Sequence, residues 1–576
     1  MEFNYTCKKN IQLLISMLKE QNIKKIIISP GTTNIMFTLS VQYDDWFELY
    51  SAADERSAAY MAVGMAAETG EPVVLSCTGA TASRNYYPGL TEAYYRKLPV
   101  IAVTSALDCA VPGQLKPQII DRSSLAKDIV IKSVTLDEIK DENDKNRCIL
   151  YLNQVFHAQK TNGGGPIHIN VVNDFSYDFN VKKLLGIRKI ESYRYLEKMP
   201  AIDNAEKIGI FIGSHGIWSQ HITDLIDEFC EKYNGVVFCD HTSNFKGKYA
   251  VNFALVAGQD QIDTSTIKVD LMIDLGCVSG DYYLVPAERS WRVSEDGEIR
   301  DRFNCLEKIF IMKEEYFFEY YNNVGTKKIT SHFHECYEKY SSILKNIPQI
   351  PFSNIWIAQQ LASQIPDNST IHFGILNSLR AWNFFEISKT ITAYSNVGGF
   401  GIDGGISTLL GASFVSPHKL YFGVFGDLAF FYDMNSLGNR HIGKNVRIIL
   451  INNGIGTEFK NYTHPGALYG DETNKYIAAA GHYGNKSLAL VKHYAEDLGF
   501  KYFQVRNESD FYHCVDEFLT PKVDTSMIME VFTDQEEESD ALRKIKNVVK
   551  SDSVKQKVKN IIGTENTIKI RQLLGK

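Results

Sequence analysis

The chain has 576 residues, of which 44% are hydrophobic, with a formal net charge of −7 and a pI near 6.1. This length suits roughly three or four domains with sizeable cores, and a slightly acidic chain without a long Lys/Arg block is unlike a nucleic-acid-binding protein. The sequence has no run of about 18 apolar residues and no apolar signal-peptide core, so we expect no membrane partner and a cytoplasmic location. The ten cysteines contain no CxxC pair, which predicts neither a zinc site nor a disulfide framework.

The first third of the chain repeats a strand–turn–helix pattern. A helix over 9–21 and a strand over 25–29 lead into a turn that contains Pro30, and small residues at helical spacing predict a helix that begins near Ala53 and ends at Gly70. Two further strands are expected at 72–77 and 99–105. Consecutive β–turn–α units indicate a parallel sheet that is covered on both faces.

The strand–turn–helix pattern ends near residue 186. The charged segment 188–203 that follows is typical of a linker. A second α/β segment follows, with strands expected at 207–213, 236–240 and 269–275. The stretch Gly-Ser-His-Gly at 213–216 could hold an anion, but an ordinary strand-to-helix turn is the simpler interpretation.

A third α/β segment begins near Ile350 and contains a strand–helix–strand unit at 422–456. Asp427 and Asn453 follow its two apolar strands, and their separation of 26 positions (453 − 427) is long enough for a parallel crossover that brings them side by side. A carboxylate, an amide oxygen and a loop carbonyl suit a hard cation such as Mg²⁺ that is shared with a diphosphate. This unit therefore predicts a metal–diphosphate site.

The fold class predicted from these patterns is α/β with three doubly wound parallel-sheet domains. We expect the domains at 1–185, 186–345 and 346–545, with a last strand at 526–531. Residues 546–576 are expected to form a Lys-rich, amphipathic helical tail.

Five ordered motifs extend over most of the chain. They are SPGTTN (29–34), ADERSAAYMAVGMA (53–66), CTGATASRNYYPGLTEAYY (77–95), NVGGFGIDGG (396–405), and GDLAFFYDMNSL with INNGIG (426–437 and 451–456). Together they resemble the thiamine-diphosphate enzymes of the acetohydroxyacid synthase and pyruvate decarboxylase superfamily. Within that superfamily they are most similar to the menaquinone-pathway 2-succinyl-5-enolpyruvyl-6-hydroxy-3-cyclohexene-1-carboxylate synthase.

The resemblance implies a pyrimidine-binding first domain, a central domain and a diphosphate-binding third domain. It also implies a homodimer or homotetramer in which each thiamine diphosphate lies between the first domain of one subunit and the third domain of another. Mg²⁺ would be bound by Asp427, Asn453 and the carbonyl of Ile455. The residues expected at the cofactor are Pro30, Gly31, Thr78, Gly79, Asn377, Ser378, Gly401, Ile402, Gly426, Asp427, Leu428, Asn453, Gly456 and Thr457.

Two residues match catalytic positions of the superfamily. Glu55 corresponds to the glutamate that hydrogen-bonds the aminopyrimidine ring and promotes loss of the thiazolium proton, a role that needs a carboxyl group in a water-poor pocket. Gln118 corresponds to a glutamine near the reacting carbons. Ile402 matches the apolar residue that holds the cofactor in its bent shape.

The positions expected to face substrate depart from the menaquinone-pathway enzyme. That enzyme has arginines that pair with substrate carboxylates where this chain has Thr33 and Val397, and neither a hydroxyl nor an isopropyl group can replace a guanidinium. The candidate substrate residues are Thr32, Thr33, Asn34, Arg84 and Val397.

The resemblance predicts an enzyme that decarboxylates a 2-oxo acid and transfers the acyl-anion equivalent to a second carbonyl or to an enone. The missing arginines favour a carboligase with an acceptor other than isochorismate. The alternatives are the menaquinone-pathway synthase itself, a thiamine-diphosphate-dependent decarboxylase or carbon–carbon hydrolase, and a non-catalytic regulatory subunit that binds the cofactor.

Overall fold

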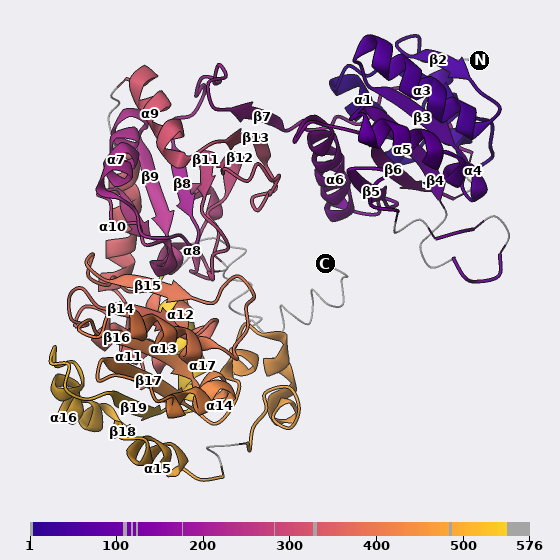
Figure 1. The fold of residues 1–576 in the computed structure, drawn as a ribbon. Helices are drawn as coiled ribbons and strands as arrows, with labels where there is room; N and C mark the ends of the chain where they lie inside the picture. The colour runs from indigo at the N-terminus through magenta and orange to yellow at the C-terminus, as the bar shows by residue number, and fades with distance from the viewer. Residues whose placement is uncertain are drawn as a thin grey trace. The chain divides into compact units, whose positions relative to one another are not determined.

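Three β-sheets organise the chain, and the predicted α/β class is confirmed (Figure 1). The chain divides into two compact units, one of residues 1–192 and 296–309 and the other of 193–295 and 310–576. The computed structural model describes residues 4–106, 112–116, 119–121, 125–174, 177–281, 283–326, 331–482 and 486–549. Among them, no helix is both long enough and apolar enough to cross a bilayer.

The first sheet has six strands, all paired in parallel. Two of its inner strands are buried at every residue, which explains their lack of polar alternation. The strand order is β2 (Glu48–Ser51), β1 (Lys25–Ile28), β3 (Val73–Cys77), β4 (Val100–Ala106), β6 (Ile167–Val172) and β5 (Lys132–Leu136). The helices of this part are α1 (Lys9–Glu20), α2 (Ile35–Gln42), α3 (Glu55–Thr69), α4 (Thr81–Asn85), α5 (Tyr87–Tyr95) and α6 (Glu142–Lys160).

Helix α3 begins and ends as its sequence predicts. The Asp54 side chain caps its N-terminus by accepting from the backbone N–H groups of Arg56 and Ser57, and Gly70 ends it with φ of +69°. The small residues face α5 closely, because a Cβ on Gly89 would stand 2.5 Å from the Cβ of Ala59. These contacts fix the start of α3, where Glu55 lies.

The second sheet has seven strands and extends into the predicted linker, because residues 188–203 contain β7. The described pairs from β10 to β12 are parallel. The strand order is β10 (Ala250–Asn252), β9 (Gly235–Cys239), β8 (Ile208–Ile212), β11 (Val269–Leu275), β12 (Ala287–Val293), β13 (Leu306–Ile311) and β7 (Glu191–Arg194). The helical elements are α7 (Gln220–Tyr233), η1 (His241–Ser243), α8 (Ala254–Ala257), η2 (Thr264–Thr266), α9 (Glu314–Val324) and α10 (His332–Lys345).

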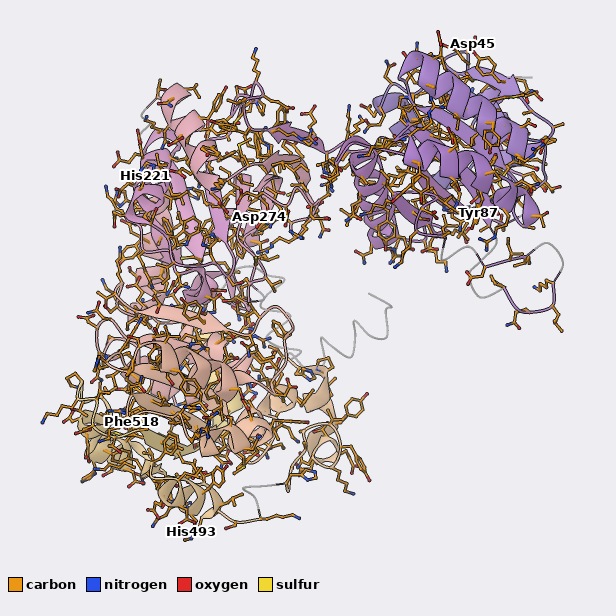
Figure 2. The ribbon with its side chains drawn as sticks, viewed as in Figure 1. Asp45, Tyr87, His221, Asp274, His493 and Phe518 are labelled. Carbon is orange, nitrogen blue, oxygen red and sulfur yellow. The ribbon has the colours of Figure 1, made fainter. Side chains whose placement is uncertain are left out.

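Two polar features mark this second sheet. Asp274 on β11, labelled in Figure 2, forms a buried ion pair of 2.9 Å with Arg292 on β12. In the Gly-Ser-His-Gly turn after β8, the N–H groups of Ser214 and His215 donate to the carbonyls of Val278 and Thr242. Those two donors are therefore used within the fold, as in a strand-to-helix turn.

The third sheet has six strands, all parallel. Its order is β15 (Thr392–Ser395), β14 (Thr370–Phe373), β16 (Tyr421–Gly426), β17 (Val446–Asn452), β19 (Met527–Phe532) and β18 (Lys501–Val505). The helical elements are α11 (Asn354–Leu361), α12 (Asn377–Trp382), α13 (Gly405–Val415), α14 (Asp427–Asp433), η3 (Met434–Gly438), η4 (Thr457–Lys460), η5 (Pro465–Thr473), α15 (Leu490–Asp497), α16 (Glu508–Phe518) and α17 (Gln535–Lys546).

Strands β8 to β12 of the second sheet belong to the same unit as the third sheet, and the two sheets share buried hydrogen bonds. The side chain of Asn244 bonds both the N–H and the carbonyl of Ala393, at 2.8 and 3.1 Å, and His241 Nε2 lies 2.9 Å from the carbonyl oxygen of Trp382. The three sheets fall within the three predicted domain ranges, whose exact boundaries stay predictions. The tail beyond residue 549 lies outside the described residues.

Candidate cofactor site

The predicted strand–helix–strand unit at 422–456 consists of β16, α14 and β17. Gly426 pairs with Ile451 across the two parallel strands, so Asp427 and Asn453 leave the sheet at the same edge. One Asp427 oxygen accepts from the N–H of Leu428 at 2.7 Å and the other from the N–H of Gly454 at 2.6 Å. The structure thus brings together the two side chains that were predicted to bind the metal.

The electrostatics of Asp427 fit a cation. The side chain is 5% exposed, and among the described residues no lysine or arginine forms an ion pair with it. Burial raises the pKa of Asp427 to about 6, although the surrounding backbone N–H groups act in the opposite direction. A buried carboxylate without a cationic partner is a suitable Mg²⁺ ligand.

Space for an anion exists beside this carboxylate. A Cβ on Gly426 would meet nothing within 4 Å, whereas a Cβ on Gly456 would lie 3.2–3.4 Å from Phe459, Ala478 and Leu428. Gly426 is one of the residues expected at the cofactor, and its open side leaves room for a diphosphate. The residues present therefore fit Mg²⁺ and a diphosphate.

Asn377 at the start of α12 joins the site through a polar network. Its amide group lies 3.2 Å from the hydroxyl of Thr457, and the Asn354 side chain donates to its backbone carbonyl at 3.0 Å. Ser378 beside it is buried. Asn377, which follows β14, and Thr457, which follows β17, thus lie within hydrogen-bonding distance of each other.

The Gly-rich turn before α13 divides into an exposed and a buried part. Gly401 is exposed and Ile402 is half-buried, as is compatible with contact to a ligand. Val397 is 3% exposed, and its Cγ1 lies 2.9 Å from where a Cβ on Gly280 would stand. Val397 therefore packs against Gly280, and its candidate role at the substrate stays a prediction.

In the first unit, the turn after β1 meets the turn after β3. The hydroxyl groups of Thr33 and Thr78 lie 2.7 Å apart, and the N–H of Gly79 donates to Thr33 Oγ1 at 3.2 Å. A Cβ on Gly31 would stand 2.4 Å from the Cβ of Thr78, so this approach requires glycine. Asn34 is buried and donates to the carbonyl of Ser29 at 3.0 Å, whereas Pro30 and Thr32 are exposed.

The remaining predicted residues of the first unit lie near α3 and α4. Glu55 is half-buried in the first turn of α3, and its carboxylate accepts from the Asn85 side chain at 3.2 Å. Arg84 donates to the Tyr87 hydroxyl and to the carbonyl of Asp121, and its guanidinium lies 5.1 Å from the Tyr87 ring, which Figure 2 labels. Gln118 lies outside the described residues.

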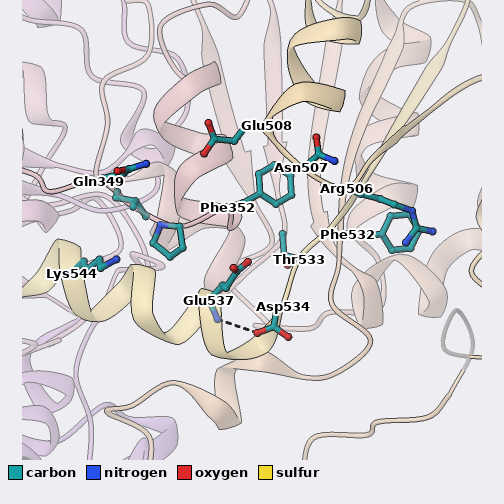
Figure 3. A pocket seen from close by; sticks show the side chains of 12 residues that line it. Gln349, Phe352, Arg506, Asn507, Glu508, Phe532, Thr533, Asp534, Glu537 and Lys544 are labelled. Atoms are coloured by element: carbon teal, nitrogen blue, oxygen red, sulfur yellow. Dashed lines mark hydrogen bonds between the residues drawn. The ribbon is translucent and has the colours of Figure 1, made fainter.

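A cavity of about 740 Å³ lies away from these residues. It lies at the ends of β18 and β19, where Figure 3 shows Arg506 beside the ring of Phe532, at 4.4 Å, and Asp534 accepting from the N–H of Glu537. It contains no predicted site residue.

A group of potential metal ligands also lies away from the predicted site. Among the described residues it consists of His221, labelled in Figure 2, with Glu315 and Glu319 at the surface. The His221 Nε2 atom is 3.1 Å from Glu315 and 3.7 Å from Glu319. These are ion-pair distances, so a surface ion pair explains the group without a metal.

Comparison with known proteins decides the family. Residues 9–125 match the family described as "Thiamine pyrophosphate enzyme, N-terminal TPP binding domain". A 2-succinyl-5-enolpyruvyl-6-hydroxy-3-cyclohexene-1-carboxylate synthase of Phocaeicola vulgatus is 30% identical over 564 residues, which cover 94% of this chain and 98% of that protein. One of Bacteroides fragilis is 31% identical over 570 residues, with the same coverage.

The chain belongs to this synthase family. It is therefore a thiamine-diphosphate-dependent enzyme, and the predicted resemblance is confirmed. A solved Rhodococcus jostii RHA1 thiamine diphosphate-dependent 4-hydroxybenzoylformate decarboxylase aligns over 91% of this chain and 99% of its own, with 16% identity and a TM-score of 0.39.

Two acidic residues around Asn377, Glu458 and Glu538, escaped the sequence interpretation of this synthase-family chain. Arg380 pairs with Glu458 at 2.9 Å, and Glu538 accepts from the N–H of Asn354 at 2.9 Å. Burial raises the pKa of Glu538 to about 7, and the Asp427 carboxylate adds to that rise. The partners are 78 and 184 positions apart, so no local pattern could have shown them.

Proposed function

We propose that this chain is a thiamine-diphosphate- and Mg²⁺-dependent enzyme that decarboxylates a 2-oxo acid and transfers the resulting acyl unit to an acceptor. The proposed reaction is that of the 2-succinyl-5-enolpyruvyl-6-hydroxy-3-cyclohexene-1-carboxylate synthases. The main support is the buried Asp427 carboxylate beside Asn453, in a chain whose relatives of that name align over nearly their full length. Among the sequence-based alternatives, the comparisons favour this synthase over a carboligase with another acceptor.

The chain's own groups would bind and orient the cofactor. Asp427, Asn453 and the carbonyl of Ile455 would hold Mg²⁺, and the open space at Gly426 would admit the diphosphate. Bound thiamine diphosphate supplies the electron sink for loss of carbon dioxide. Glu55, at the start of α3, would hold the proton that is shared with the aminopyrimidine ring.

The names of the relatives state their product, which indicates the chemical class of the donor and of the acceptor. A succinyl group as the transferred acyl unit calls for a 2-oxo acid with a second carboxylate, and the cyclohexene carboxylate calls for an anionic enone acceptor such as isochorismate. Because Thr33 and Val397 supply no guanidinium, other cations of the assembled site would bind these carboxylates.

Assembly and location form part of the same proposal. We infer a homodimer or homotetramer, with each site between the first domain of one subunit and the third domain of another, in the cytoplasm. The support is the family to which the chain belongs.

Incubation of purified protein with thiamine diphosphate, Mg²⁺ and a panel of 2-oxo acids tests the proposal. Carbon dioxide release with 2-oxoglutarate, and a succinylated product by mass spectrometry once isochorismate is added, are expected. Release with another 2-oxo acid only, or product only with another acceptor, would favour the carboligase alternative. No release with any acid would indicate a non-catalytic subunit, and an Asp427→Asn variant serves as the inactive control.

A further inference from the structure

A second cavity lies between the second and third sheets, away from the cofactor residues. Its volume is about 270 Å³. It opens where β9 ends, and the carboxyl ends of parallel strands are common ligand sites. Its lining includes Lys246, Lys248, His241 and Tyr337 from the central part of the chain and Lys389 from the third sheet's domain.

Lys246 is the unusual group in this cavity. The residue is half-buried, and among the described residues no carboxylate lies within ion-pair distance of its ammonium. Burial lowers the pKa of Lys246, and the nearby Lys389 ammonium lowers it further. A cation that is buried beside a second cation is unfavourable unless an anion joins them.

The other charged groups of the lining also have contacts within the fold. Both Asp240 oxygens accept from neighbours, one from Thr242 and the other from the Ser279 hydroxyl at 2.6 Å. Lys248 Nζ lies 3.5 Å from Glu231. Lys389 Nζ donates to the carbonyl of Gly247 at 3.2 Å, which holds it beside the loop that carries Lys246.

Glu386 is the one remaining carboxylate among the described residues of the lining. Its pKa is raised by burial, with Lys389 acting in the opposite direction. Among the described residues, neither Glu386 nor Asp240 lies within ion-pair distance of Lys246, so this ammonium has no carboxylate partner.

We propose that this cavity binds the phosphate group of a small phosphorylated metabolite. Lys246 and Lys389 would contact the phosphate from the two domains, since lysine ammonium groups bind phosphate as point charges and a dianion matches two of them. The rings of Phe245, Phe333 and Tyr337 would cover the organic part of the ligand. Such a ligand would link the central domain to the third, and its binding requires no cofactor turnover.

Thermal unfolding in increasing inorganic phosphate tests the site. The full chain is first saturated with thiamine diphosphate and Mg²⁺ so that the cofactor site is filled, and chloride keeps the ionic strength constant. We expect a saturable rise in the unfolding midpoint. The rise should need about tenfold more phosphate in Lys246→Met and in Lys389→Met.

Lys339→Met is the matched control, because the Lys339 ammonium donates to the carbonyl of Thr266 at 2.6 Å and does not line the cavity. Its phosphate response should equal that of the unsubstituted chain. Lys246→Met removes a buried charge and should fold; if it does not, Lys389→Met alone decides.

Three results would overturn the proposal. They are a midpoint that phosphate does not shift, an equal shift in all variants, and an equal shift produced by acetate at the same concentration and ionic strength. The last would show that the cavity does not distinguish phosphate from a carboxylate.

Discussion

The carboxylate of Asp427 accepts a hydrogen bond of 2.6 Å from the N–H of Gly454, so the residue that follows β16 is bonded to the turn that follows β17. Two residues 27 positions apart in sequence are thereby held at one end of adjacent strands. The same carboxylate is a candidate cation ligand, so its protonation state should control the affinity for a cation.

Mg²⁺ affinity should depend on pH through Asp427. Its pKa of about 6 lies above the usual value of 3.8, and the ion requires the deprotonated form, so affinity should be constant above pH 7 and fall about tenfold per unit below pH 6. Equilibrium dialysis of Mg²⁺ with thiamine diphosphate present checks this. Asp427→Asn should bind too weakly for a pH dependence to appear, and an unchanged affinity in that variant would contradict the assignment.

Glu55→Gln should suppress exchange of the thiazolium proton by at least about a hundredfold while Mg²⁺-dependent cofactor binding is retained. The amide has nearly the same shape but cannot share the proton. Proton NMR of the bound cofactor in deuterated water measures the exchange. Glu48→Gln, at an exposed position on β2, is the matched control. Exchange that persists in Glu55→Gln would show that another group assists.

Gly280→Ala should destabilise the second unit by roughly 1–3 kcal/mol through overpacking. The added Cβ would stand 2.3 Å from Leu379 Cδ2 and 2.9 Å from Val397 Cγ1. Chemical denaturation measures the change in unfolding free energy. A companion Val397→Ala substitution should recover part of the loss, and Gly398→Ala, which meets nothing within 4 Å, should have little effect.

Glu538→Gln should remove a pH dependence of stability. Because the folded pKa of about 7 lies above the usual 4.5, the folded chain keeps a proton that the unfolded chain loses as pH rises from 4.5 to 7. Stability should therefore fall by about 1.4 kcal/mol per pH unit over that window, or about 3 kcal/mol in all, and stay constant above it. Denaturant unfolding at pH 5, 6, 7 and 8 compares the chain with the variant, and equal slopes would contradict the prediction.

The sequence alone determined the elements and their order. Residues 9–21, 72–77 and 269–275 carry their structure in local apolar patterns and turn residues, so the helix and strands form nearly where they were predicted. The five ordered motifs likewise identified the thiamine-diphosphate cofactor, through their resemblance to a known superfamily.

Only the tertiary structure decided which side chains meet across the sheets. Strand β7 forms within the predicted linker by pairing with β13. The local sequence could not show this pairing, because β13 lies more than a hundred residues further along the chain. Long-range packing likewise decides the Arg380–Glu458 pair and the burial of Val397 against Gly280. It also decides the hydrogen bond from Lys389 to the Gly247 carbonyl. Local propensity acts over a few residues, whereas the charge and burial of a site depend on whatever the fold places beside it.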